Sequence, residues 1–449
     1  MNQTRLLLPE YAHRFQCIGS ACEDTCCQGW QVPVDEATYQ RYQNLPDGPL
    51  RARIVENLEP KPAEEAASNP AIFAIIRMTA ENRCPLLTAD RLCGIQSAYG
   101  HELLSYTCAT YPRVRHTGSG SAITALTLSC PEAARLVLLA PNLLETGTTP
   151  DRVAEPATQY AGGTAYLSHA LLECADDIRT TVIRTATNHL YPLWQRLFLL
   201  NVFAKRLDGI ATGESDRTPA DFLADFNATA AQGSLRLAMD ALPGDDLAQM
   251  DAVLRLAGLM LHRSNVGPRF QECINAFTNG IGNAPDATLR SLAAQARSAH
   301  QLYFAPFFRH HPRILENYLV NTVLRLNFPF GSAKNPDEKG RTITQRFVIL
   351  AAQFALIRGL LIGVAGHHGE RFSADHVVHT VQSASKHFEH HPEFGKQILE
   401  LLAELKLDTS SGLTILLREP VHTAGSNPRG PSSQRAASGH YPNSVHPVS

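Results

Sequence analysis

Apolar residues recur three and four positions apart through the second half of the chain, from about residue 167 to residue 417. The clearest examples are YPLWQRLFLLNVFAKRL (191–207), AQMDAVLRLAGLMLHR (248–263), HPRILENYLVNTVLRLNF (311–328) and DHVVHTVQSASKHF (375–388). This spacing places the apolar side chains on one face of a helix, so this half of the chain is predicted to be α-helical. No repeat of fixed period accompanies the pattern, which argues against a solenoid.

The first 141 residues lack this period. Short apolar-rich segments, AIFAIIRM (71–78) and SAITALTLSC (121–130), are separated by polar loops and are predicted to be strands. A helix is predicted to begin at Asp35, whose carboxylate can accept hydrogen bonds from first-turn amides. We therefore expect a mainly α protein in which an irregular, cysteine-rich N-terminal region (1–141) precedes an α-helical domain (165–418).

Three further segments change this picture. Residues 142–164 collect Gly, Pro, Thr and charge, and are predicted to form a linker. Residues 419–449 are rich in Ser, Pro, Gly and Asn, cannot bury a core, and are predicted to be a disordered tail. The run FVILAAQFALIRGLLIGVAG (347–366) approaches membrane-spanning length, but Gln353 and Arg358 inside it would be costly in lipid. This run is predicted to be a buried core helix, with no membrane insertion.

The amino-acid composition indicates the class of protein, its partners and its expected location. Hydrophobic residues make up 44% and charged residues 18% of the chain, as in globular proteins. The formal net charge of -2 gives no reason to expect nucleic acid as a partner. Three leucines before Pro9 form too short an apolar run for a secretion signal, so the protein is expected in the cytoplasm.

Eight of the ten cysteines precede residue 131 and fall into four groups: Cys17, Cys22, Cys26 and Cys27; Cys84 and Cys93; Cys108; and Cys130. A reducing cytoplasm disfavours a disulfide framework, whereas four soft thiolates converging from loops bind zinc or an iron-sulfur cluster. The chain has no paired C-x2-C knuckles, which favours an iron-sulfur cluster of the 4Fe-4S type over zinc. The region 1–141 is therefore predicted to bind metal, with the choice of four ligands left open. Cys174 and Cys273, isolated on helical stretches, are predicted to be inert buried thiols.

The same residues carry a resemblance to a known family. RFQCIGSACEDTCCQGWQV, RCPLLTADRLCGIQ, LLSYTCATYPRV and LTLSCPEAARL, in that order, resemble the flagellin lysine-N-methylase family. The likeness continues through HPRILENYLVNTVLRLNFPFG and FVILAAQFALIRGLLIGVAGHHGE and covers the chain from Tyr11 to about Leu407. It implies an iron-sulfur protein that transfers methyl groups from S-adenosylmethionine to lysine side chains of flagellin, its protein substrate.

Two expected motifs for such chemistry are missing from the sequence. No strand is followed by a glycine-rich turn and a helix, and GSGS (118–121) and NGIGN (279–283) are predicted to be turns, so the α/β methyltransferase fold is not expected. A C-x3-C-x2-C motif beginning at Cys22 and Cys26 would need its third cysteine where Gly29 stands. No catalytic residue and no S-adenosylmethionine-binding residue is therefore assigned.

Two alternatives remain beside the enzyme. One is a non-enzymatic iron-sulfur or zinc module for electron transfer, metal chelation or redox sensing, and the other is a structural zinc site in an adaptor. The histidines His310, His311, His367, His368, His387, His390 and His391 are predicted to be capping or surface residues rather than metal ligands. The aromatic residues Tyr106 and Tyr111 beside Cys108 are predicted to belong to the core rather than to a substrate wall.

Overall fold

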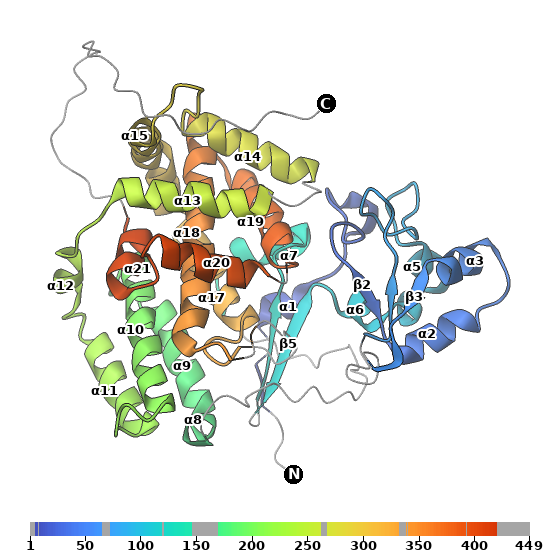
Figure 1. Ribbon diagram of the computed structural model, residues 1–449, viewed down its shortest axis with the longest axis horizontal. Helices are drawn as coiled ribbons and strands as arrows, with labels where there is room; N and C mark the ends of the chain where they lie inside the picture. Colours follow the sequence, from blue (N-terminus) through green and yellow to red (C-terminus); the bar gives the residue numbers. More distant parts are fainter. Residues whose placement is uncertain are drawn as a thin grey trace.

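The computed structural model describes residues 5–7, 9–64, 72–118, 121–145, 169–261, 267–331, 338, 340–391 and 393–419. Most of the predicted linker (146–164) and nearly all of the predicted tail (420–449) lie outside these residues. The helical pattern predicted for the second half is confirmed, because the described residues from 169 to 417 form helices joined by short turns. In Figure 1 these helices form one body, and a smaller lobe containing β2, β3, α2 and α3 stands beside it.

The helical body contains fourteen named helical segments among the described residues. They are α8 (His169–Glu173), α9 (Ala175–Ala186), α10 (Leu193–Ala211), α11 (Pro219–Ala231), α12 (Arg236–Asp240), α13 (Asp246–Leu261), α14 (Pro268–Gly280), α15 (Leu289–Ala299), α16 (Ala305–His310), α17 (Arg313–Arg325), α18 (Ile343–His368), α19 (Ala374–Phe388), α20 (Phe394–Glu404) and α21 (Ser410–Leu417). A π-helical turn, η4 (His300–Phe304), joins α15 to α16, and a 3-10 turn, η6 (Gly369–Arg371), follows α18.

Helix α18 is the centre of this body and confirms the predicted core helix. It is long and apolar enough to cross a membrane, but 94% of its apolar window is buried inside the protein. The buried Arg358 donates hydrogen bonds to the carbonyl oxygens of Leu416 (2.9 Å) and Leu417, at the end of α21. Its charge therefore caps the carboxyl end of a neighbouring helix, where a cation is favourable.

Glycines on α18 let α14 approach closely. A Cβ atom placed on Gly363 would lie 2.5 Å from Cδ2 of Phe277. A Cβ atom on Gly280 would lie 1.7 Å from the carbonyl oxygen of Gly363. The two helices therefore cross backbone against backbone, a contact that only small residues permit.

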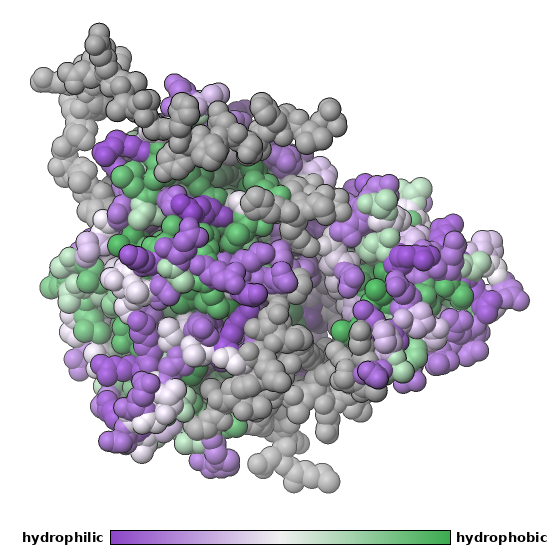
Figure 2. Space-filling model, in the orientation of Figure 1, coloured by the Kyte–Doolittle hydropathy of each residue, from purple (hydrophilic) through white to green (hydrophobic). Residues whose placement is uncertain are grey.

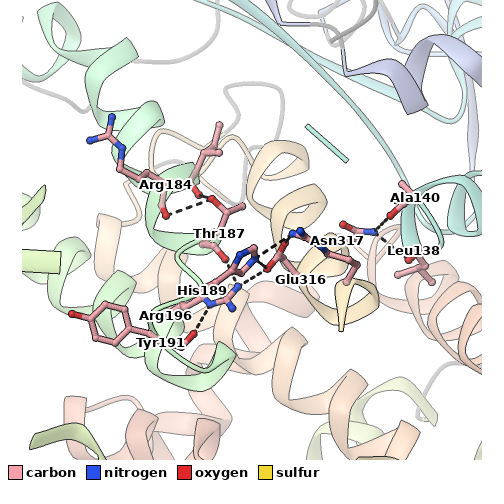
Figure 3. Close-up of polar contacts among 12 residues, drawn as sticks. Leu138, Ala140, Arg184, Thr187, His189, Tyr191, Arg196, Glu316 and Asn317 are labelled. Atoms are coloured by element: carbon pink, nitrogen blue, oxygen red, sulfur yellow. Dashed lines mark hydrogen bonds and ion pairs between the residues drawn. The ribbon is translucent and has the colours of Figure 1, made fainter. Parts of the chain in front are cut away.

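A buried ion-pair network joins α9, α10 and α17 (Figure 3). Glu316 on α17 accepts hydrogen bonds from Arg196 Nη1 at 2.6 Å and Arg313 Nη1 at 2.6 Å, and lies 2.7 Å from His189 Nε2. Arg196 also donates to the carbonyl oxygens of Ala186 and Tyr191. Because Glu316 and Arg196 are both buried, each needs the other to offset the loss of water.

The first 145 residues form small sheets and short helices. The helices are α1 (Glu10–Arg14), α2 (Glu36–Gln43), α3 (Pro49–Glu56), α5 (Gly94–Tyr99), α6 (Tyr106–Thr110) and α7 (Pro131–Leu138), with 3-10 turns η1 (Gly19–Ala21) and η3 (His101–Leu103). One sheet has the order β1 (Arg5–Leu7), β6 (Ser121–Leu126), β5 (Arg113–Gly118), with β1 parallel to β6. The other is antiparallel, in the order β2 (Val32–Val34), β4 (Ala74–Ile76), β3 (Leu58–Pro60).

Several local predictions for this region are confirmed. Asp35 caps α2 by accepting a hydrogen bond from the amide of Thr38 at 2.9 Å. Both predicted strands exist, as β4 and β6, although each is shorter than its apolar segment. The turn predicted at 279–283 follows the end of α14 at Gly280, and Gly118 pairs with Ser121 across the β5–β6 hairpin, whose two middle residues lie outside the described residues. Two three-stranded sheets do not make an α/β methyltransferase fold in the described residues.

The described residues before position 146 contribute to two separate hydrophobic cores. Val32, Val34, Tyr42, Ile54 and Ile76 belong to a core confined to the small lobe. In contrast, α1, β6 and α7 contribute to the core of the helical body. The buried Asn321 on α17 fastens this second group, because its amide exchanges hydrogen bonds with the backbone of Leu126 and accepts one from Tyr11 Oη at 2.8 Å.

Candidate metal centre

The loop between α1 and β2 carries four cysteines, and backbone pairing brings two more beside it. The amide of Cys84 donates to the carbonyl oxygen of Cys27 at 2.7 Å, next to a bridge between Gln28 and Arg83. A second bridge pairs Leu87 with Cys93, which is the N-cap residue of α5. Residues about sixty positions apart in the chain therefore present their thiols at one place.

Three of these thiols form a hydrogen-bonded chain. Cys26 donates to Cys27, and Cys27 donates to Cys84. Donation to Cys27, together with burial of the thiol, raises the pKa of Cys26 far above its ordinary value. The bond from Cys26 lowers the pKa of Cys27, but donation to Cys84 and burial outweigh it and raise that pKa to about 12. The bond from Cys27 lowers the pKa of Cys84.

The remaining cysteines lie around this chain. Cys93 and Cys108 are close enough to Cys84 to influence it electrostatically, and burial raises the pKa of Cys108 to about 12. On the other side, Cys130 at the N-terminus of α7 interacts electrostatically with Cys22 and Cys26, and Cys22 interacts with Cys17. The four sequence groups therefore converge. Cys174 and Cys273 stand apart from them, Cys174 at the start of α9 and Cys273 buried on α14.

The sulfur donors of this cluster are of the type that thiophilic metals prefer. In this structure, however, the cysteines are free thiols, and three of them are hydrogen-bonded to one another. All ten cysteines are free of disulfides, and Cys27, Cys84, Cys93 and Cys108 supply soft sulfur donors within or against the core of the small lobe. Within the described residues, no three His, Cys, Asp or Glu side chains are already placed to hold one metal ion. A metal would therefore have to replace the hydrogen bonds among these thiols, and binding would release their protons.

Helix α19 holds the cysteine loop with three side chains spaced four residues apart. Gln382 Nε2 donates to Asp24 Oδ2 at 2.8 Å and to the carbonyl oxygen of Ser129 at 2.9 Å. Lys386 Nζ donates to both carboxylate oxygens of Asp24 (2.8 and 2.9 Å) and to the carbonyl oxygen of Thr25 (2.8 Å). The third residue, His390, follows the end of α19 and stacks on Trp30 with ring centroids 5.0 Å apart. We call Gln382, Lys386 and His390 the α19 clasp.

The charge of Lys386 acts directly on Asp24. Burial raises the pKa of this carboxyl, but the charge and hydrogen bond of Lys386, together with hydrogen bonds from Thr25 and Gln382, outweigh burial and lower that pKa below its ordinary value. Asp24 therefore stays ionised beside the thiols. A half-buried ion pair thus joins the helical body to the loop that bears Cys22 and Cys26.

Two pockets are lined by residues of this junction. The first, of about 360 Å³, is lined by charged and polar residues that include Asp24, Arg83, Arg269 and Lys386. The second, of about 330 Å³, is lined by residues from α6, β5, α17 and the end of α19. We call the second the Trp30 pocket, because Trp30, Tyr111 and His390 stack along it, with 5.9 Å between the ring centroids of Trp30 and Tyr111.

The sequence analysis missed the helical side of this junction. His387 and His390 are not the capping or surface residues that were predicted: His387 is buried, with its ring 4.2 Å from that of Phe270, and His390 belongs to the clasp. Tyr111 packs against the core of the helical body, as predicted, and in addition lines a pocket. The available signal was a polar row four residues apart, at Gln382, Lys386 and His390, on a helix whose remaining residues include a strongly apolar face.

On the face shown in Figure 2, hydrophilic residues cover much of the lobe and alternate with apolar areas over the helical body. Fold and site together define a mainly helical protein with a thiol-rich N-terminal lobe clasped to it. Residues 179–416, more than half of the chain, match the family described as the FliB lysine N-methylase C-terminal domain. The chain therefore belongs to the FliB lysine N-methylase family.

Relatives extend this likeness over the N-terminal lobe. Proteins named lysine-N-methylase from Salmonella typhimurium and Salmonella choleraesuis are each 26% identical to the chain, over 88% of this chain and 94% of the relative. A flagellar biosynthetic protein FliU from Salmonella muenchen is 32% identical over 33% of this chain and 85% of its own length. No solved structure matches the chain.

Proposed function

We propose that this protein is a protein-lysine N-methyltransferase that uses S-adenosylmethionine and acts on lysine side chains of flagellin in the cytoplasm. The observation that carries the proposal is the match to lysine-N-methylases along nearly their whole length, which includes the cysteine lobe as well as the helical body. The flagellar name of a further relative supports a flagellar substrate.

The proposed reaction is a direct displacement. The lone pair of a neutral lysine Nζ attacks the methyl carbon of the sulfonium, a new C–N bond forms, and the C–S bond breaks with its electron pair on sulfur. The products are S-adenosylhomocysteine and a methylated ammonium, and the one proton released overall is the proton that the substrate amine loses to solvent before attack. Because an ordinary lysine has a pKa of about 10.4, the substrate amine must lose its proton before attack.

We further propose that the converging thiols hold an iron-sulfur cluster of the 4Fe-4S type, with ligands drawn from Cys26, Cys27, Cys84, Cys93 and Cys108. The support is their convergence and the hydrogen bonds that link three of them. Such a cluster supplies electron transfer or a rigid cross-link between loops. In this protein, Cys27 and Cys84 would then tie the loop after α1 to the segment before α5.

The first experiment combines metal analysis with a transfer assay. The protein is purified without oxygen, its iron, sulfide and zinc are measured, and it is incubated with flagellin and methyl-labelled S-adenosylmethionine. Iron with matching sulfide, and label on flagellin lysines identified by mass spectrometry, are the expected results. Iron without transfer to flagellin would point instead to an electron-transfer or sensing module, and zinc alone without transfer to a structural site.

Cysteine variants test the proposed ligands. Cys84→Ser is expected to lose nearly all bound iron, because serine oxygen is a poor ligand for iron in such clusters and Cys84 accepts the last hydrogen bond of the thiol chain, near Cys93 and Cys108. Cys174→Ser is the matched control and is expected to keep the iron content of the unmodified protein, since Cys174 lies outside the cluster. Equal iron in both variants would refute the proposed ligand set.

A further inference from the structure

The Trp30 pocket has an aromatic wall and a charged floor. The rings of Trp30, Tyr111 and His390 form a triangle. Trp30 makes interplanar angles of 19° with His390 and 26° with Tyr111, and the centroids of Tyr111 and His390 are 6.3 Å apart. The floor is an ion pair between Arg325 Nε and Glu389 Oε1, 3.1 Å apart, whose side chains are 11% and 3% exposed. Thr127 donates a further hydrogen bond to Glu389. A buried ion pair does not by itself indicate that the pair stabilises the fold. Because this pair lies beneath an open pocket, a role in binding a ligand is the alternative.

Both signs of charge line this pocket. Arg113, His116 and Arg325 bring positive or protonatable groups, while Glu338 and Glu389 bring carboxylates. A nucleotide with several phosphates would meet repulsion from the two carboxylates. A nucleoside that carries an amino-acid group presents a carboxylate to the arginines and an ammonium to the glutamates, and so matches this mixture.

We propose that the Trp30 pocket binds the methyl donor S-adenosylmethionine, with the aromatic wall taking its adenine and the Arg325–Glu389 floor taking its amino-acid group. This inference rests on the proposed function. The pocket volume of about 330 Å³ lies within the range of pockets that hold cofactors. A sulfonium cation is also attracted to aromatic faces, which the stacked rings supply.

The other pocket at the junction fits this ligand less well. Its aromatic ring, Phe270, is almost completely buried and so offers little face on which an adenine could stack. The aromatic rings of the Trp30 pocket are also connected to segments that carry cysteines. Trp30 Nε1 donates to the carbonyl oxygen of Cys26 at 2.8 Å, and Tyr111 directly follows α6, the helix that contains Cys108.

The test measures binding of S-adenosylhomocysteine to the metal-loaded protein by equilibrium dialysis. Trp30→Leu is expected to weaken binding about tenfold or more, because stacking of a base on an aromatic ring contributes about 1–3 kcal/mol. Trp30→Phe keeps a ring and is expected to bind within about threefold of the unmodified protein. Trp194→Phe, on α10 and away from the pocket, is expected to leave binding unchanged. ATP, with its phosphates, is expected not to compete.

Iron content and circular dichroism show whether Trp30→Leu is folded. If Trp30→Leu does not fold, the fluorescence of Trp194→Phe is measured instead, because Trp30 is the one remaining tryptophan in that variant. Saturation with S-adenosylhomocysteine is then expected to quench or shift the Trp30 emission. Unchanged Trp30 emission, or unchanged affinity of a folded Trp30→Leu, would overturn this binding site. If the unmodified protein still methylated flagellin, the proposed function would nevertheless stand. Absence of both donor binding and methyl transfer in the unmodified protein would overturn both.

Discussion

Replacing Glu316 with glutamine removes the negative charge from the network in Figure 3 and keeps the size of the side chain. Glu316 and Arg196 have side chains that are 8% and 10% exposed. Removing one partner of a buried pair costs about 3–5 kcal/mol, because the other charge stays buried without compensation. Arg196 keeps two backbone acceptors, and Arg313 is half exposed, so the lower end of this range, about 3 kcal/mol, is expected.

The loss is expected to depend on pH in a defined direction. Burial opposes ionisation of Glu316, but hydrogen bonds from Arg196, Arg313 and His189 outweigh it and lower its pKa below the ordinary 4.5. A carboxyl with a lowered folded-state pKa stabilises the fold above its unfolded-state pKa, and this contribution is lost as pH falls through the folded-state pKa. The difference between the two proteins is therefore complete at pH 7 and shrinks below about pH 4.5.

Urea unfolding at pH 7 and at several lower pH values measures this difference. Fluorescence of Trp194, two positions before Arg196, reports on the network when Trp30 is replaced by phenylalanine in every protein compared. Asp251→Asn is the matched control, since it breaks a more exposed pair with Arg255 and is expected to cost less than about 1 kcal/mol. A cost below about 1 kcal/mol for Glu316→Gln, or one that stays constant down to low pH, would refute the reasoning.

Two other substitutions test the packing. Lys386→Met leaves Asp24 without its cation, so it is expected to reduce stability by roughly 2–3 kcal/mol. It is also expected to speed amide hydrogen exchange in the cysteine loop. The control Lys396→Met removes the lysine of an exposed ion pair and is expected to change neither stability nor exchange. Unchanged exchange in Lys386→Met would show that the clasp does not hold the loop. Gly363→Ala is expected to destabilise the protein by about 1–3 kcal/mol in thermal unfolding because its methyl group would overlap Phe277, while Gly258→Ala, with open space around it, should stabilise by about 0.5–1 kcal/mol. Equal effects of the two alanines would contradict the close helix crossing.

The secondary structure of the helical body could be read from the chain because it depends on local spacing. Apolar positions three and four apart predict helices, and α10, α13, α17 and α19 form where that pattern runs. Helix α13 buries mainly one face, whereas α17 is buried at every position from Ile314 to Leu324. The core position of α18 followed from its length and its two polar residues. The soft donor set was visible for the same reason, since the cysteines are clustered along the chain itself.

The junction depends on contacts that no local pattern contains. Lys386 and Asp24 are 362 residues apart, and Gln382 reaches Ser129 across 253 residues. A polar residue such as His390 can face either solvent or an aromatic ring, depending on which elements pack together. This packing is determined by many weak contacts over the whole chain. The sequence alone therefore determined the helices and the thiol donors, whereas only the tertiary structure decided where the thiols meet, what clasps them and which rings form the adjoining pocket.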